Sequence, residues 1–220
     1  MERLISNHSD LRRIWDHTHQ TKLASELPEE DLIAFIEQLQ PRLHPGMPLL
    51  DVGCGRGRNL PYLSRLGFDV YGCDISSVAL KLAQARTQQT GLSLRFQAAE
   101  LTHLPFASDS FAIVVCVHVL PYYFKANIIE GVRELWRVLQ PKGWLYLDLL
   151  DCEDAEYGCG KRLEEHTFLD PDGVPIHFSS RQEINELSNY LTLQQASRVE
   201  SKPAFGHSRV KWVLWAAKEE

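Results

Sequence analysis

The sequence predicts an α/β protein built on a doubly wound, mostly parallel sheet, and two observations support this prediction. Short apolar segments alternate with amphipathic, helix-like segments across residues 48–151. One of them, FAIVVCVHVL at 111–120, is apolar almost throughout, as expected for a parallel strand covered on both faces. Such alternation is typical of right-handed βαβ crossovers.

The individual elements follow from local signals. The first predicted helix, residues 27–41, is amphipathic, carries acidic residues in its first turn and has a proline at its end. The helix predicted over 76–91 begins with serines and ends at Gly91, which are typical caps. Further helices are predicted over residues 57–67, 127–143 and 180–191. Strands are predicted over residues 48–53, 68–74, 92–98, 111–120, 143–151, 191–199 and 209–218.

The chain of 220 residues is expected to form a single domain over 1–220 with a substantial core. Residues 152–180 break the alternation, and their DCEDAEYGCG and LDPDGVP segments predict loops. We expect this stretch to be an insertion or lid after the fifth strand. Residues 1–27 carry no clear element signal and are expected to form an N-terminal lid or arm.

Composition and charge argue against some classes of partner. The formal net charge is -6, whereas a protein that wraps DNA or RNA would present a basic face. No N-terminal run is apolar enough for a signal peptide, and the most apolar segment, 111–120, is too short to span a bilayer. The 5 cysteines lack CxxC spacing, which indicates free thiols in a reducing cytoplasm. We expect a cytoplasmic protein with no membrane or nucleic-acid partner.

The segment LLDVGCGRGRN, residues 49–59, places three glycines directly after the first predicted strand. Glycine permits positive φ at a tight turn, and its missing side chain lets a ligand lie on the backbone. The GxGxG spacing differs from the GxGxxG of dinucleotide-binding enzymes, and Asp51 inside the strand end would repel a pyrophosphate. A carboxylate there suits a ligand with a cationic or hydrogen-donating group.

A second acid, Asp74, ends the next predicted strand, about twenty residues after the glycines. An acid at this point can accept hydrogen bonds from both ribose hydroxyls of an adenosine. The chain has no GxxxxGK[ST] sequence, so the glycine turn is not a phosphate-binding P-loop.

Four segments together resemble the successive motifs of class I S-adenosylmethionine-dependent methyltransferases. They are LLDVGCGRGRN, the strand-ending Asp74, AAELTHLPFASDSFAIVVCVHVL and RELWRVLQPKGWLYLDLL. The resemblance covers about residues 45–151 and points to the small-molecule branch, which includes the tellurite-resistance-type methyltransferases. It implies a Rossmann-like sheet of about seven strands with an antiparallel last strand. It also implies S-adenosylmethionine as cofactor, S-adenosylhomocysteine as product and a small-molecule methyl acceptor, with the protein a monomer or homodimer.

The resemblance implies roles for individual residues. The three glycines would pass the methionine part of the cofactor, with Asp51 near its amino group. Asp74 would hold the ribose and Ile75 would lie against the adenine. Glu100 replaces the family's usual aspartate as acceptor from the adenine amino group, and Leu101 supplies a nearby backbone N–H. The expected cofactor-binding residues are Asp51, Gly53, Cys54, Gly55, Gly57, Asp74, Ile75, Glu100, Leu101, Cys116 and Val117.

Methyl transfer is an in-line displacement in which the protein positions the nucleophile behind the methyl group. His118, at the end of the fourth strand beside Cys116 and Val117, is the candidate base or substrate contact, since an imidazole titrates near neutrality. Tyr122 could stack on the substrate or the sulfonium. The alternatives are a histidine that only packs at the strand end and an aromatic residue of the core.

No metal site is expected. His17 and His19 lack further spaced ligands, so a solvated loop is favoured, with a lid in which Trp15, Asp16 and His19 fold over the cofactor as the alternative. The acidic run PEED at 28–31 is interpreted as a solvated helix face. The cysteines beyond the fifth strand are interpreted as free thiols rather than a soft-metalloid site; they are Cys152 and Cys159.

Two rival functions remain at this point. A methyltransferase-like protein could bind the cofactor or a partner without catalysis, and the intact glycine turn argues against lost cofactor binding only. A nicotinamide-dependent oxidoreductase is opposed by the GxGxG spacing and by Asp51. Ala112, which stands where the family usually has an aspartate, is expected at a strand start away from the ligand.

Overall fold

The computed structural model describes residues 8–22, 25–92, 94–201 and 209–219. Its α-helices are α1 (His8–Thr21), α2 (Glu30–Leu39), α3 (Leu60–Arg65), α4 (Ser77–Gln89), α5 (Lys125–Val138) and α6 (Arg181–Glu186). Short 3-10 helices are η1 (Gln40–Arg42), η2 (Leu120–Tyr122) and η3 (Leu187–Asn189). The strands are β1 (Pro48–Val52), β2 (Asp69–Asp74), β3 (Arg95–Ala98), β4 (Phe111–Cys116), β5 (Leu139–Asp151), β6 (Lys161–Glu164), β7 (Thr167–Leu169), β8 (Pro175–Ser179), β9 (Leu193–Ser201) and β10 (Arg209–Ala217).

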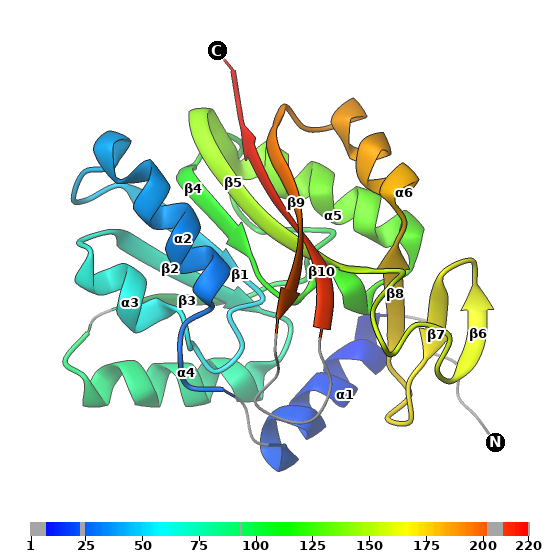
Figure 1. Ribbon diagram of the computed structural model, residues 1–220. Coiled ribbons are helices and arrows are strands. Elements are labelled where there is room, and N and C mark those ends of the chain that lie inside the picture. Colours follow the sequence, from blue (N-terminus) through cyan, green and yellow to red (C-terminus); the bar gives the residue numbers. More distant parts are fainter. Residues whose placement is uncertain (1–7, 23–24, 93, 202–208, 220) are drawn as a thin grey trace.

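The core of the sheet runs in the order β3-β2-β1-β4-β5-β10-β9 (Figure 1). The first five strands are parallel, and β10 is antiparallel to both of its neighbours. This arrangement confirms the predicted Rossmann-like sheet with an antiparallel last strand. Strand order reverses between β1 and β4, so the carboxyl ends of these two strands mark the point at which open α/β sheets bind ligands.

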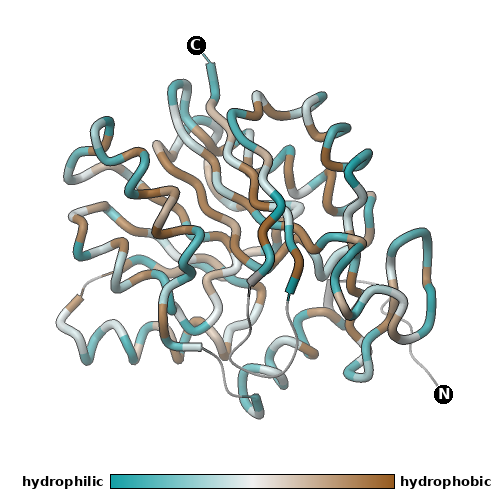
Figure 2. The backbone as a smooth tube through the Cα atoms, in the orientation of Figure 1, coloured by the Kyte–Doolittle hydropathy of each residue, from teal (hydrophilic) through white to brown (hydrophobic). Residues whose placement is uncertain are grey.

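Two apolar cores cover the two faces of the sheet, because successive side chains of a strand point to opposite faces. Leu49 and Ile113 pack on the side of α2 and α3, whereas Leu50 and Val114 pack on the side of α5 (Figure 1). Hydrophobic colour accordingly concentrates in the central strands and hydrophilic colour on the outer turns of the helices (Figure 2). Burial on both faces explains why β4 is apolar throughout.

The predicted strand over 111–120 is too long. It ends at Cys116, and the chain turns there because His118 adopts a left-handed conformation with φ 55°. The helix predicted over 57–67 also shortens, to Leu60–Arg65, since the glycine turn occupies the residues before it.

The predicted helix over 127–143 ends at Val138, and the chain passes directly into β5. Pro141 explains this end, because proline cannot donate the helical hydrogen bond and disfavours helical backbone in the residue before it. The helix predicted over 180–191 is present as α6 followed by η3.

The two segments expected to be loops, DCEDAEYGCG and LDPDGVP, contain the turns before β6 and between β7 and β8, whereas the antiparallel β6–β8 meander itself was not predicted. LDPDGVP is the hairpin turn between β7 and β8, where Gly173 has φ 84° and the Asp170 carboxylate accepts hydrogen bonds from two backbone N–H groups. β8 then pairs in parallel with β5 through Leu150 and Phe178. The meander therefore extends the sheet beyond the end of β4.

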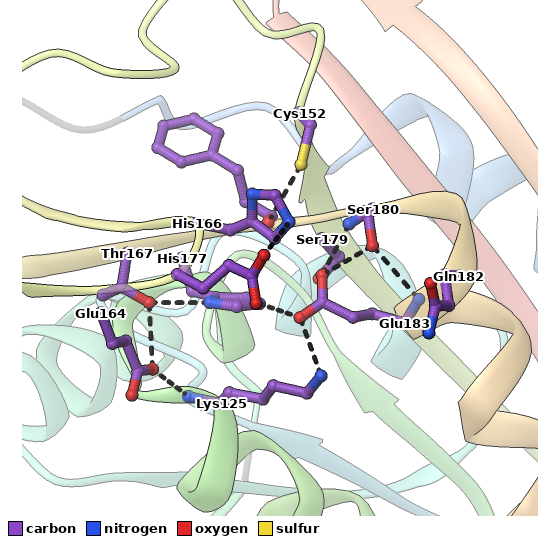
Figure 3. A network of polar contacts seen from close by, with 12 residues as sticks. Lys125, Cys152, Glu164, His166, Thr167, His177, Ser179, Ser180, Gln182 and Glu183 are labelled. Atoms are coloured by element: carbon purple, nitrogen blue, oxygen red, sulfur yellow. Dashed lines mark hydrogen bonds and ion pairs between the residues drawn. The ribbon is translucent and has the colours of Figure 1, made fainter. Parts of the chain in front are cut away.

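One face of the meander is tied to α5 and α6 by a polar network (Figure 3). His177 is buried, and its Nδ1 lies 2.8 Å from the Thr167 hydroxyl. Its Nε2 lies 3.6 Å from Glu183, which also contacts Lys125 at 3.1 Å and caps the start of α6 together with Ser180. Burial is the main cause that lowers the pKa of His177 from its ordinary value.

We predict that His177→Gln destabilises the protein by about 1–3 kcal/mol at pH 8, since it leaves buried polar groups without their partners. The difference in unfolding free energy between wild type and variant should become smaller toward pH 5. A histidine with a lowered folded pKa stabilises the protein above its unfolded value of about 6.5, and that contribution disappears as the pH falls. Chemical denaturation between pH 5 and 8 measures this, with exposed His44→Gln as control. A wild-type-to-variant difference that stays constant with pH would contradict the prediction.

Candidate functional site

A cavity of about 110 Å³ lies at the carboxyl ends of β1, β2 and β4, at the point where strand order reverses. It brings together residues from the glycine turn, from the ends of three strands, from η2 and from α1. The sequence-predicted residues that line it are Gly53, Gly55, Asp74, Ile75, Leu101, His118 and Tyr122. The structure thus gathers residues that are far apart in the chain.

The glycine turn requires glycine for two different reasons. Gly53 and Gly55 have φ of 69° and 53°, which side chains with a Cβ rarely adopt. A Cβ on Gly53 would also lie 2.1 Å from Cγ2 of Val119, so no side chain fits. Gly57 does not line the cavity, and its missing side chain instead lets the turn pack against Ala83 of α4.

Asp74 lies at the end of β2 with only 7% of its surface exposed. Its carboxylate accepts hydrogen bonds from the backbone N–H groups of Gly55 and Ser76, each at 2.8 Å. Burial raises the pKa of Asp74 to about 6, although these two hydrogen bonds favour the charged form. Ile75 follows directly and presents an apolar surface to the same cavity.

Asp51 lies behind the glycine turn, 1% exposed, and does not line the cavity itself. Its Oδ2 has no hydrogen-bond partner among the described residues. Burial raises the pKa of Asp51 to about 7, with Arg58 acting in the opposite direction. A buried carboxylate oxygen without a donor is costly, so this position fits a ligand that brings an ammonium group.

The remaining predicted cofactor residues lie behind the cavity wall. Glu100 accepts hydrogen bonds from the backbone N–H and the hydroxyl of Thr102. Glu100 does not line the cavity, whereas its neighbour Leu101 does. Cys54, Cys116 and Val117 are buried and do not line the cavity.

Ala112 and the cysteines beyond β5 lie outside the cavity lining. Ala112 lies at the start of β4, as expected, away from the cavity. All cysteines are free thiols, with Cys159 exposed and Cys152 partly buried.

His118 sits between two carboxylates at the edge of the cavity. Its Nε2 lies 3.2 Å from Glu29, its Nδ1 lies 3.4 Å from Asp148, and its backbone N–H donates to Asp148 at 2.6 Å. The backbone hydrogen bond helps to hold the left-handed conformation of His118. Its side chain is 39% exposed, so the ring remains accessible.

A buried cation completes this cluster. Lys211 Nζ contacts Glu29, lies 2.9 Å from Asp31 and lies 3.5 Å from Asp148. Burial raises the pKa of Glu29, but His118 and Lys211 outweigh it and hold that pKa well below its ordinary value. Glu29, His118 and Asp148 offer ligand atoms within 4.8 Å of one another, a spacing that suits a metal, yet the Lys211 ammonium already balances these carboxylates.

The sequence interpretation missed this cluster. The acidic run that contains Glu29 was expected to be solvated, whereas the Glu29 side chain is only 15% exposed and also pairs with Arg58 at 2.9 Å. A signal was present in Asp148 and Lys211, because a charged residue inside an apolar strand is buried only when it has a partner.

The segment around His17 and His19 is helical rather than a loop, and α1 lies beside α4 (Figure 1). His17 is exposed, whereas Trp15 and His19 line the cavity. Asp16 accepts a hydrogen bond from the Ser76 hydroxyl at 2.6 Å, at the start of α4. The Arg56 guanidinium of the glycine turn donates to backbone carbonyls at the end of α1. α1 therefore contacts the elements that form the cavity.

Parts of the sequence are similar to known methyltransferases. Residues 50–147 match the family described as "Methyltransferase domain". The chain is 38% identical to the uncharacterized methyltransferase YodH of Bacillus subtilis over 46% of the chain and 42% of that protein. It is 26% identical to the tRNA N(3)-methylcytidine methyltransferase Mettl2 of Drosophila melanogaster, over 79% of the chain and 55% of that protein. The chain thus spans about half the length of these curated relatives.

The fold is also found in solved structures. A SAM-dependent methyltransferase from Methanosarcina mazei superimposes with a TM-score of 0.74 at 24% identity, covering 88% of this chain and 99% of that one. Its likeness shows the fold, and the family match covers the glycine turn, Asp74 and the end of β4. The cofactor of this family, S-adenosylmethionine, also fits the donor-free oxygen of Asp51. Residues 50–147 therefore match a methyltransferase domain, and the chain has the fold of a SAM-dependent methyltransferase.

Proposed function

We propose that the protein transfers the methyl group of S-adenosylmethionine to a small-molecule acceptor. The observation that carries this proposal is the buried, donor-free Oδ2 of Asp51 beside the glycine turn. The ammonium group of the cofactor would satisfy Asp51, and its ribose hydroxyls would meet Asp74. Ile75 and Leu101 would form the apolar surfaces around the adenine. Gly53 would leave room for the methionine part.

When bound, the cofactor supplies an electrophilic methyl group on a sulfonium. The acceptor's nucleophilic atom forms a bond to the methyl carbon while the carbon–sulfur bond breaks, and that electron pair stays on sulfur. The protein contributes orientation and exclusion of water, which can supply about 7–11 kcal/mol of the barrier. The aromatic rings of Trp15 and Tyr122, 4.9 Å apart, suit a site in which positive charge is present before transfer.

His118 would receive the acceptor's proton when the nucleophile begins as a hydroxyl or amine. Each ring nitrogen of His118 lies within ion-pair distance of a carboxylate. Glu29 and Asp148 would act as positioning residues that orient the ring. Tyr122 would hold the acceptor by ring contact.

We also propose that α1 and the meander act as lids over the site in one domain that works in the cytoplasm, as a monomer or homodimer. Among the described residues no helix is long and apolar enough to cross a bilayer.

A nucleic-acid acceptor is the rival, because one relative is a tRNA methyltransferase. The net charge of -6 favours the small molecule, and binding without catalysis remains the other alternative.

We predict that S-adenosylhomocysteine binds the wild-type protein and that Asp74→Ala weakens its affinity by at least about 10-fold, because the hydrogen bonds from the ribose hydroxyls to a charged group are lost. Isothermal titration calorimetry measures both. Asp69→Ala is the matched control, because Asp69 begins the same strand and forms an exposed ion pair with Arg95. The site assignment fails if folded wild-type protein does not bind, or if both variants bind equally well.

We predict that cofactor binding releases protons between about pH 6 and 7.5. In the free protein burial raises the pKa of Asp51 to about 7, and a bound ammonium group would favour its charged form. Affinity for S-adenosylhomocysteine should therefore rise with pH through this range. Calorimetry in buffers of different ionisation enthalpy counts the protons. Asp51→Asn should remove most of the release, and equal proton release in this variant would contradict the prediction.

A further inference from the structure

A second and larger cavity opens beside the cofactor cavity. Its volume is about 1010 Å³, compared with about 110 Å³ for the first, and it lies between α1 and the β6–β8 meander. Trp15 and Tyr122 line both cavities. The two spaces therefore share a wall formed by these two rings.

The meander gives this cavity an apolar wall. Phe168 and Ile176 are directly opposite each other in the register of β7 and β8, and Phe178 follows two residues later on the same face. All three line the cavity, and the rings of Phe168 and Phe178 lie 6.1 Å apart. The alternate residues, Thr167 and His177, point to the other face and into the polar network (Figure 3). Because successive side chains of a strand point to opposite faces, one face of the meander lines the cavity and the other carries the polar network.

Most of the charged groups that line this cavity form ion pairs with one another. Lys22 at the end of α1 pairs with Asp172 at the tip of the β7–β8 hairpin. Arg209 at the start of β10 lies 2.6 Å from Glu156 and 3.4 Å from Asp154. A charged ligand would have to break such pairs or lie on apolar surface, and either costs free energy. The lining therefore favours an uncharged ligand.

We infer that the methyl acceptor is a bulky, largely apolar, uncharged molecule held between α1 and the meander. This inference rests on the proposed function and adds the class of substrate to it. The cavity volume lies at the upper end of the range of about 300–1,000 Å³ typical of ligand pockets. Ile176 is the partly exposed member of the apolar wall, since Phe168 is 9% and Phe178 1% exposed, and a small hydrophilic acceptor would leave Ile176 in contact with water. The nucleophilic atom of the acceptor would lie at the shared wall of Trp15 and Tyr122.

The test uses the neutral fluorophore 1-N-phenylnaphthylamine, titrated into the full-length protein saturated with S-adenosylhomocysteine. Ile176→Asp places a charge on the apolar wall and should weaken probe binding at least 10-fold. Ile129→Asp is the matched control, because Ile129 is also partly buried but lies on α5 outside this cavity. Both variants should bind S-adenosylhomocysteine as wild type does. The anionic probe 8-anilino-1-naphthalenesulfonate should bind more weakly than the neutral one.

Different outcomes separate the two proposals. Equal probe binding by wild type and Ile176→Asp, with S-adenosylhomocysteine binding intact, would overturn the acceptor class and leave the proposed function standing. Tighter binding of the anionic probe than of the neutral one would overturn the inference that the acceptor is uncharged. Failure of folded wild type to bind S-adenosylhomocysteine would remove the proposed function. If Ile176→Asp does not fold, Ile176→Trp keeps the wall apolar but fills space, and it should also weaken probe binding.

Discussion

Three buried carboxylates lie at the carboxyl ends of the sheet, and the structure depends on which groups stabilise their negative charge. Ionised carboxylates in a low-dielectric site need hydrogen bonds or a cation. Asp74 has the N–H groups of Gly55 and Ser76, and Asp148 has the N–H group of His118 with Lys211 nearby. Oδ2 of Asp51 and Oδ2 of Asp148 both lack a hydrogen-bond donor among the described residues, but Oδ2 of Asp148 lies 3.5 Å from the Lys211 ammonium, whereas no ion pair joins Asp51 to a described residue. Asp51 is therefore the carboxylate at this edge whose charge a cationic ligand would balance.

The need to stabilise buried carboxylates also distinguishes the two sides of the proposed site, the acceptor side around His118 and the cofactor side around Asp51 and Asp74. On the acceptor side, the ammonium of Lys211 on β10 joins β5 to the residues around the start of α2, and His118 is held in a left-handed conformation against this cluster. On that side the Lys211 ammonium balances the carboxylates without a ligand. On the cofactor side, the raised pKa values of Asp51 and Asp74 mean that burial opposes their charged forms. Binding free energy is thus available there, because a cation relieves a cost that the free protein carries.

The sequence predicted the parts of this arrangement that depend on local pattern. The order of strands and helices, the glycine turn and the strand-ending Asp74 all follow from periodicity and spacing within short segments. The cluster around His118 could not be predicted this way, because Glu29 and Lys211 are 182 positions apart and meet only where the start of α2 lies against β10. The meander was missed for another reason: β7 and β8 are 3 and 5 residues long, so their alternation is too brief to distinguish from a loop.

In the proposed complex, the wall that the two cavities share would lie between cofactor and acceptor. Trp15 comes from α1, which is anchored to the cofactor-binding elements through Asp16 and Ser76, and its ring lies against Tyr122 of η2. The same helix reaches the hairpin of the meander through Lys22 and Asp172. A ligand that moves α1 would therefore change both cavities together. Since the smaller cavity is enclosed partly by Trp15 and His19, we expect the cofactor to enter with a displacement of α1, and the acceptor wall to take its final shape afterwards.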